Sequence, residues 1–308
     1  GPAEVIKMID CREVTEKTAD TLVRASTVFR PDQIAAYKRA AENEESPHAR
    51  WVLNNILENA EIAESKVFPL CDDTGIPHLF LEVGEECVVP AGFYKAVEEG
   101  VAKGLRTLPG RPMAVMGNDA ERISQSGGLS DDSGALAMAP IQTRHVPGKD
   151  IRLTVMMYGG GPEARELDAI GVNDVTLDLD GKTLRVFHKH SVDTVIDEMI
   201  AWGAEGAKLL GCLPCVLVFG IGRSNYEAAS LGMEAMAKGN FLVQSEMEKR
   251  ITDAVNESGY GALGLGGKTT VLGTFVKVGP QRASGIRVVS MRLGCCFDPR
   301  RAECLFEG

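Results

Sequence analysis

The chain is short of basic residues, and this shortage limits the partners it can have. Its 308 residues include 33 lysines and arginines against 43 aspartates and glutamates, a formal net charge of −10 at pH 7. An acidic chain repels polyanions, so we expect it to bind neither nucleic acid nor an anionic membrane surface. A small anionic substrate is still compatible with this charge, because a few arginines or lysines in one place reverse the local field.

Long apolar runs are missing as well. No run approaches the roughly 18 residues that a membrane-spanning helix needs, and the N-terminus shows no signal peptide. We therefore expect a cytoplasmic protein without a membrane segment. Gly1 and Pro2 resemble the remnant of a proteolytic cleavage.

A dense set of cysteines is missing too, since eight in 308 residues are too sparse for a disulfide-stapled secreted scaffold. In a cytosolic protein, some thiols more often bind metal or take part in catalysis. Three sites lie at a predicted strand edge beside a turn: Cys71, the pair Cys212 and Cys215, and the pair Cys295 and Cys296. Because these sites are far apart in sequence, they suggest one thiolate-bound centre that the fold assembles. The other cysteines are interpreted as small buried hydrophobes, namely Cys11, Cys87 and Cys304.

Apolar periodicity predicts a mixed α/β fold. The N-terminal region carries apolar side chains at helical spacing, and we interpret its helices as packing elements without chemistry. After Val67, strands and helices alternate. The predicted helices are 20–30, 31–43, 49–65, 90–105, 191–210, 226–238 and 241–258, and the predicted strands are 79–83, 151–158, 216–219, 271–278 and 286–293, with a hairpin over 175–187.

Two carboxylates, Asp72 and Asp73, follow Cys71. Beside a thiol they would raise its pKa, which does not suit a nucleophile. Beside a metal the cation dominates the local field, so the carboxylates can handle protons or hydrogen-bond to the ligands. The alternative is an aspartate-rich turn, since Asp-Asp-Thr-Gly is good turn chemistry.

Two glycine-rich stretches resemble nucleotide sites. Residues 266–269 (GGKT) resemble the end of a P-loop, but the position that needs the first glycine is Ala262, and the segment precedes a strand. Gly220 and Gly222 resemble a dinucleotide turn, but the third glycine is replaced by Asn225. The sequence therefore gives little support for a nucleotide site.

Several short motifs, in a consistent order, are similar to those of a known family. They are 71–75 (CDDTG, for CQDTG), 159–163 (GGGPE, for GGGSE), 212–214 (CLP, for CPP), 220–222 (GIG), 264–270 (GLGGKTT, a full match) and 296–301 (CFDPRR, for CxxxRH). The chain thus resembles the iron–sulfur hydro-lyases of the class I fumarase and L-tartrate dehydratase family, in their α subunit or N-terminal domain. The resemblance runs from about Val67 to Glu303.

The resemblance implies a [4Fe–4S] cluster held by Cys71, Cys212 and Cys296, with Cys215 and Cys295 as neighbours. Three thiolates leave one iron without a protein ligand, and that iron can act as a Lewis acid toward a substrate hydroxyl. Asp73 matches an aspartate near the cluster, and we expect it to act in catalysis by hydrogen bonding to the iron-bound water or hydroxyl.

The resemblance also implies a small 2-hydroxy (di)carboxylic acid as substrate, such as malate/fumarate or tartrate. The substrate motifs match less well than the cluster motifs. The family's THxAxxP appears as 281–287 (QRASGIR), with Arg282 for the histidine and Arg287 for the proline, and its NTGDNTPA appears as 129–135 (LSDDSGA), without the asparagine and the proline. A different hydroxy acid is therefore also compatible with the sequence as the substrate. The expected substrate-binding residues are Asp72, Arg106, Asp131, Lys268 and Arg282.

For the fold, the resemblance implies a helical N-terminal region followed by a mixed-sheet cluster-binding domain of the class I fumarase N-terminal type. We expect one domain over 1–308, with a helical region over 1–66 and an α/β region over 67–308. Family members need a β-type domain that carries the base. It is absent from this sequence, so we expect a separate β-type subunit as partner. We also expect the α chains to form a homodimer.

A non-catalytic protein is the alternative: a zinc-binding or iron–sulfur subunit with a structural or electron-transfer role. Cys212, Cys215, Cys295 and Cys296 could form a four-thiolate zinc site. That interpretation leaves Cys71 and the two aspartates beside it without a role.

Overall fold

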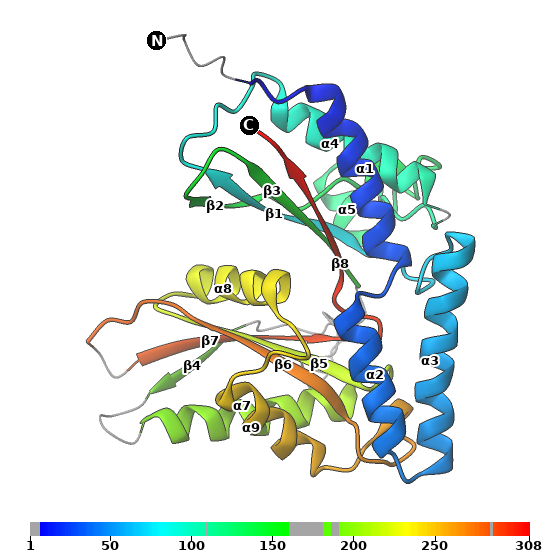
Figure 1. The fold of residues 1–308 in the computed structure, drawn as a ribbon, viewed down its shortest axis with the longest axis vertical. Coiled ribbons are helices and arrows are strands. Elements are labelled where there is room, and N and C mark those ends of the chain that lie inside the picture. Colours follow the sequence, from blue (N-terminus) through cyan, green and yellow to red (C-terminus); the bar gives the residue numbers. More distant parts are fainter. Residues whose placement is uncertain (1–6, 109, 160–180, 186–190, 284–285) are drawn as a thin grey trace. The chain divides into compact units, whose positions relative to one another are not determined.

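The computed structural model describes residues 7–108, 110–159, 181–185, 191–283 and 286–308. The chain forms two compact units (Figure 1). Unit 1 comprises Gly1–Val28, Ile62–Tyr158 and Arg300–Gly308, and unit 2 comprises Phe29–Glu61 and Gly159–Pro299. The contacts do not follow the expected boundary at residue 66, because the first helix belongs to unit 1 and the second to unit 2. A single domain over 1–308 stays a prediction.

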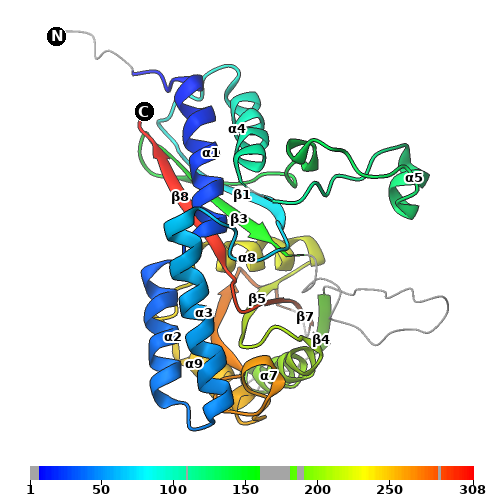
Figure 2. The same cartoon turned by 90° about the vertical axis from the view of Figure 1, so that its right-hand side faces the viewer.

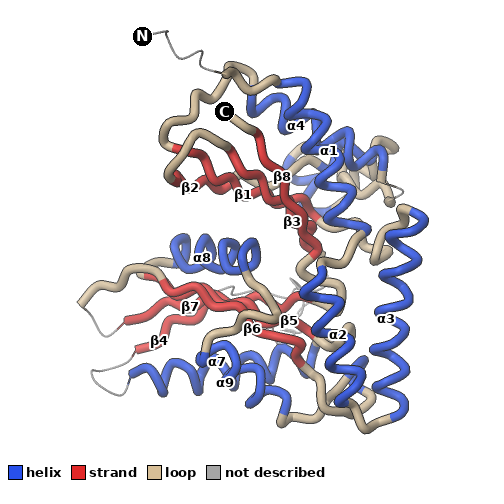
Figure 3. Tube along the Cα trace, viewed as in Figure 1, coloured by secondary structure: helices blue, strands red, loops and turns tan. Residues whose placement is uncertain are grey.

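Unit 1 is a four-stranded mixed sheet packed against two helices. The strand order is β2-β1-β3-β8, with β1 parallel to β2 and the other pairs antiparallel. Helices α1 and α4 lie together against the sheet (Figure 3). The elements are α1 (Cys11–Thr27), β1 (Ile76–Gly84), α4 (Phe93–Thr107), β2 (Gln142–Val146), β3 (Ile151–Tyr158) and β8 (Arg300–Phe306).

A long connection leaves unit 1 between α4 and β2. It contains α5 (Asp119–Ser124) and the short 3-10 helix η1 (Ser133–Leu136). Figure 2 shows α5 at the tip of this connection, away from the sheet of its unit. Helix α5 forms within this connection because Asn118 and Glu121 cap each other's backbone N–H groups at its start.

Unit 2 is a mixed sheet covered on both faces. The strand order is β4-β7-β5-β6, with β5 parallel to β6 and antiparallel to β7. Helix α8 covers one face and α7 and α9 the other (Figure 1). The elements are α2 (Pro31–Asn43), α3 (Pro47–Lys66, whose end belongs to unit 1), β4 (Gly181–Arg185), α7 (Ser191–Leu209), β5 (Cys215–Gly222), α8 (Asn225–Lys238), α9 (Glu246–Asn256), β6 (Val271–Val278) and β7 (Ile286–Gly294).

The glycines at the end of β5 serve helix packing. A Cβ on Gly220 would lie 2.0 Å from the carbonyl oxygen of Ala228 and 2.4 Å from the backbone nitrogen of Gly232, both on α8. A side chain cannot fit at such distances, so glycine lets α8 lie directly on the strand. This packing accounts for the Gly220–Gly222 motif without a nucleotide.

The mixed α/β class is confirmed. Strands β3 and β6 and helix α2 have the predicted bounds. Strand β8 was not predicted, because its residues alternate irregularly between charged and apolar. The first half of the hairpin expected over 175–187 lies outside the described residues, while β4 pairs with β7. Among the helices that the structure describes, none is long and apolar enough to cross a bilayer.

Candidate functional site

Strand direction in unit 2 brings three predicted site residues to one edge of the sheet. Because β5 and β6 run parallel and β7 antiparallel, the starts of β5 and β6 lie beside the end of β7. Cys212 precedes β5, Lys268 precedes β6 and Cys296 follows β7. We call this the cysteine edge, defined by residues 211–214, 261–270 and 295–299.

Two of the predicted cluster ligands are joined by a backbone hydrogen bond at this edge. The N–H of Cys296 donates to the carbonyl oxygen of Cys212 at 3.0 Å. Cys212 is exposed and Cys296 is buried. The turn after β7 is closed by Asp298, whose Oδ2 accepts from the N–H of Cys295 at 2.9 Å. The two thiol-bearing loops are therefore held in a fixed backbone relation.

The neighbouring cysteine Cys215 lies in a different environment. It is fully buried on β5, and burial raises the pKa of its thiol to about 12. A buried thiol with a raised pKa is typical of a structural cysteine. This contrast with the exposed Cys212 agrees with the sequence-based choice between the two.

Neither the four-thiolate zinc site considered above nor the cluster site is preformed among the described residues of the chain. The zinc-site members Cys212, Cys215, Cys295 and Cys296 all belong to unit 2, yet the described residues of the chain contain no group of three or more His, Cys, Asp or Glu side chains placed to hold a metal ion. That finding also covers the three predicted cluster ligands, of which Cys71 belongs to unit 1. Of the three predicted cluster ligands, unit 1 therefore carries Cys71 and unit 2 carries Cys212 and Cys296.

The loop that carries Lys268 is fixed by the corner between α2 and α3. Glu44 is 1% exposed, and its Oε2 accepts from the N–H of Lys268 at 2.9 Å. Gly267 has φ +145°, and a Cβ there would lie 2.8 Å from the same carboxylate oxygen. Glycine is required there for both reasons. The ammonium group of Lys268 pairs with Glu45 at 2.7 Å, and this pair lowers the pKa of the Glu45 carboxyl.

In unit 1, Cys71 lies half-buried on the loop before β1. Its Sγ is 3.7 Å from Oδ1 of the exposed Asp72. Oδ1 of Asp73 accepts from the N–H of Gly75 at 3.1 Å, and the carbonyl oxygen of Asp73 accepts from Nη1 of Arg300 at 2.6 Å. Arg300 is 2% exposed, so a buried guanidinium holds this loop. Sequence reasoning gave Arg300 no role, although it lies in the terminal CxxxRH-like motif.

Arg106 pairs with Asp132, the neighbour of the predicted residue Asp131. The guanidinium of Arg106 donates two hydrogen bonds of 2.9 Å each to the Asp132 carboxylate. This contact, followed by a bond from the N–H of Gly134, lowers the pKa of Asp132 to about 2. Asp131 is exposed beside the pair.

Arg282 lies at the other edge of the unit 2 sheet. It belongs to the connection between the end of β6 and the start of β7. Strand β5 has eight residues, so about 25 Å of sheet separates the two edges. The sheet does not bring Arg282 to Lys268 and Cys296 as the sequence suggested, and its role in substrate binding stays a prediction. Residues 160–163 of the GGGPE motif lie outside the described residues.

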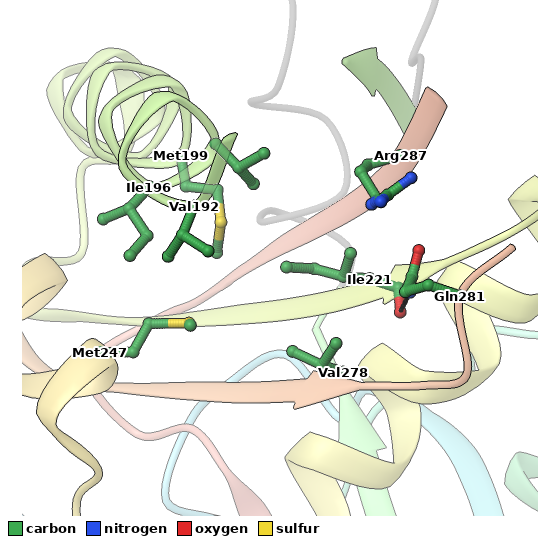
Figure 4. Close-up of a pocket in the computed structure, with 9 residues that line it drawn as sticks. Val192, Ile196, Met199, Ile221, Met247, Val278, Gln281 and Arg287 are labelled. Carbon is green, nitrogen blue, oxygen red and sulfur yellow. Dashed lines mark hydrogen bonds between the residues drawn. The ribbon is translucent and has the colours of Figure 1, made fainter. Parts of the chain in front are cut away.

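Figure 4 shows an apolar pocket at this other edge, with a volume of about 130 Å³. Side chains from α7, α9, β5 and β6 form its wall, and Gln281 and Arg287 lie at one side. The lining residues are Val192, Val195, Ile196, Met199, Ile221, Met247, Val278, Gln281 and Arg287. None of the predicted site residues lines it, so this pocket is separate from the cysteine edge.

Comparison with known proteins agrees with the motifs. A family model described as Fumarate hydratase (Fumerase) matches residues 15–304. The chain belongs to this family. It is 26% identical over 286 residues to a Methanocaldococcus jannaschii protein named "Putative L(+)-tartrate dehydratase subunit alpha", covering 90% of this chain and 91% of that protein.

Two further relatives cover nearly the whole chain. The L(+)-tartrate dehydratase subunit alpha of Escherichia coli K12 is 21% identical, over 96% of this chain and 93% of that protein. A Geobacillus stearothermophilus protein named "Putative fumarate hydratase class I" is 25% identical over 94% of this chain, which spans only 56% of that relative. The members of this family thus include chains of this length and longer ones.

Proposed function

We propose that the chain is the cluster-carrying α subunit of an iron–sulfur hydro-lyase. Membership of the fumarate hydratase family supports a hydro-lyase that acts on small hydroxy acids. The substrate that we propose is a 2-hydroxy (di)carboxylic acid such as malate/fumarate or tartrate. The observation that carries the proposal is the hydrogen bond between Cys296 and Cys212 at an edge that also carries Lys268.

The donor set suits a [4Fe–4S] cluster with Cys71, Cys212 and Cys296 as ligands. When bound, such a cluster supplies an iron without a protein ligand, which can act as a Lewis acid. Cys71 is included because residues 71–75 (CDDTG) are similar to the family's CQDTG motif. No disulfide joins the eight cysteines, which suits a reducing, cytoplasmic compartment.

The acidic chain must gather positive charge locally to bind a carboxylate substrate. Lys268 and Arg106 each pair with an exposed carboxylate, Glu45 and Asp132 respectively. Exposed pairs of this kind are worth little, so a substrate carboxylate can displace them. We propose that both cations bind the substrate, and that Asp72 and Asp131 take part in binding it.

Asp73 is the proposed catalytic residue of this chain. The bond from Gly75 to its Oδ1 fixes the carboxylate on the loop of Cys71. From there it would hydrogen-bond to the substrate hydroxyl or to the water that leaves. We assign the base to a β-type subunit, in line with relatives that are named alpha subunits, and we propose a homodimer of α chains.

The test combines cluster analysis with turnover. The chain is purified anaerobically, its iron and sulfide are measured, and dehydration of malate and tartrate is assayed with and without a co-expressed β-type subunit. We expect a visible charge-transfer band in both samples and turnover at least about 10²-fold lower without the partner, since general-base catalysis contributes 10²–10⁴-fold.

Three results would contradict this proposal. Zinc in place of iron, with no visible band, would favour the structural alternative. A stable cluster without turnover in either sample would favour electron transfer. Full turnover by the isolated chain would show that its base is internal.

A further inference from the structure

One face of helix α2 donates three hydrogen bonds to the turn that carries Cys296. Nη1 of Arg30, at the N-cap, donates to the carbonyl oxygen of Pro299 at 2.6 Å. Nε2 of Gln33 donates to the carbonyl oxygen of Phe297 at 3.3 Å. Positions 30, 33 and 37 are spaced three and four apart, so they share one face of the helix.

The third donor acts on the predicted ligand itself. The hydroxyl of Tyr37 makes a short hydrogen bond to the carbonyl oxygen of Cys296. Tyr37 is 1% exposed, and its ring stacks on Phe29 with centroids 5.7 Å apart and planes 5° from parallel. A buried, stacked ring has little rotational freedom, so the hydroxyl is held at one place. The sequence had suggested only packing for this helix.

The peptide groups on both sides of Cys296 are therefore fixed. Its own N–H donates to Cys212, and its carbonyl oxygen accepts from Tyr37. With both peptide planes held, the Cα–Cβ bond of Cys296 has one direction, and only rotation about that bond remains for the thiol. A ligand fixed in this way needs little ordering when a metal binds.

We propose that Tyr37 is the positioning residue for Cys296, which it holds in the direction that binds the cluster. This inference rests on the proposed function. Tyr37 does not touch substrate; it acts through the backbone of a ligand. Its loss should therefore change how the cluster is held, with little change in the fold of the cluster-free chain.

The test compares three variants of the full chain after anaerobic reconstitution. Tyr37→Phe keeps the stacked ring and removes only the hydroxyl. Gln33→Met removes a donor of the same helix to the carbonyl of Phe297, which is not a ligand, and so reports general loosening of the turn. Tyr226→Phe removes a hydroxyl from a tyrosine that is 84% exposed on α8.

The measurements are the rate of iron release to a chelator, the electron paramagnetic resonance spectrum of the reduced cluster, and the melting temperature of the cluster-free chain. For Tyr37→Phe we expect iron release about five- to tenfold faster, the change that one lost hydrogen bond supports, and a shifted spectrum. Gln33→Met and Tyr226→Phe should stay within about twofold of the parent with an unchanged spectrum. Tyr37→His, which keeps a ring donor, should recover some of the effect.

The outcomes separate the two proposals. A parent chain that takes up no iron and sulfide contradicts the proposed function, and this inference with it. A loaded parent with Tyr37→Phe indistinguishable from it overturns the role of Tyr37 alone. Equal acceleration in Tyr37→Phe and Gln33→Met also overturns it, because the turn as a whole would then be responsible. If Tyr37→Phe does not fold, Tyr37→Leu, which also lacks the hydroxyl, is compared with Gln33→Met by the same criteria.

Discussion

The two edges of the unit 2 sheet are built from the same strands but are held differently. At the cysteine edge, buried side chains from α2 and the following corner reach the loops across the sequence: Tyr37 contacts Cys296, and Glu44 contacts Lys268. At the other edge, the contacts come from the connections of the sheet itself: Arg223 pairs with Glu227, and Gln281 donates to the carbonyl oxygen of Ile221, with an apolar pocket nearby. The comparison shows that strand direction determines which loops lie at the same edge of the sheet. Helix α2 and the corner after it then add buried hydrogen bonds to the loops of the cysteine edge.

The largest effect should come from breaking the cysteine edge at its thiols. Cys212→Ala should abolish the visible cluster band, because it removes an exposed ligand. Cys215→Ala in the same motif should retain it, because that side chain is 1% exposed and packs in the core of unit 2. Iron and sulfide per chain measure both. Cys296→Ala and Cys295→Ala form a second matched pair, and retention of the band in Cys212→Ala would reverse the assignment.

A kinetic comparison of the two edges comes next. Lys268→Ala should lower kcat/KM for the hydroxy acid about 10- to 100-fold, the range for loss of a charge-assisted contact to a carboxylate. Arg282→Ala tests the predicted role of that arginine in substrate binding: a similar loss would support the role, and a change within about threefold would exclude it. Steady-state kinetics with the β-type subunit present measure both variants. A large loss in Arg282→Ala would show that Arg282 contributes to substrate binding although the unit 2 sheet does not bring it to the cysteine edge.

The rigidity of the cysteine edge should be visible in stability. Glu44 is buried and accepts from the N–H groups of Glu45, Ser46 and Lys268. Glu44→Ala leaves these donors without that acceptor and should lower the free energy of unfolding by about 2–4 kcal/mol. Glu45→Ala removes only an exposed pair and should change it by at most about 0.5 kcal/mol. Urea denaturation of the cluster-free chain compares them, and equal losses would argue against the buried anchor.

The smallest effect concerns an exposed pair in unit 1, which serves as a reference for both edges. The pKa of Asp132 is lowered to about 2 by Arg106 and Gly134. Because the folded pKa lies below the unfolded one, the pair stabilises the fold above about pH 4 and loses its effect as pH falls toward 2. Carboxyl NMR of Asp132 should show the low midpoint, and Arg106→Gln should raise it. An unchanged midpoint would exclude the ion pair as the main cause.

The elements of the fold could largely be read from local patterns. Strands β3 and β6 are rich in apolar and β-branched residues, most of them buried or half-buried, which is the composition expected of strands that pack in a core. Helix α2 begins at Pro31, which is favoured in the first turn of a helix. Strand β8 escaped prediction because it is only partly buried, so its alternation of charged and apolar residues is irregular. The short helix α5 escaped because none of its residues is buried, and only its capping residues mark it.

The sequence by itself determined the α/β class, the family motifs and the choice of candidate ligands, because these depend on local composition and order. Only the tertiary structure decided which loops share an edge. Arg282 and Cys296 flank the same strand β7, and the direction of that strand carries them to opposite edges of the sheet. The contact of Tyr37 with Cys296 joins residues that lie 259 positions apart. Every residue has a backbone carbonyl oxygen that can accept a hydrogen bond, whatever its side chain. The sequence around Cys296 therefore contains no pattern that predicts the contact with Tyr37.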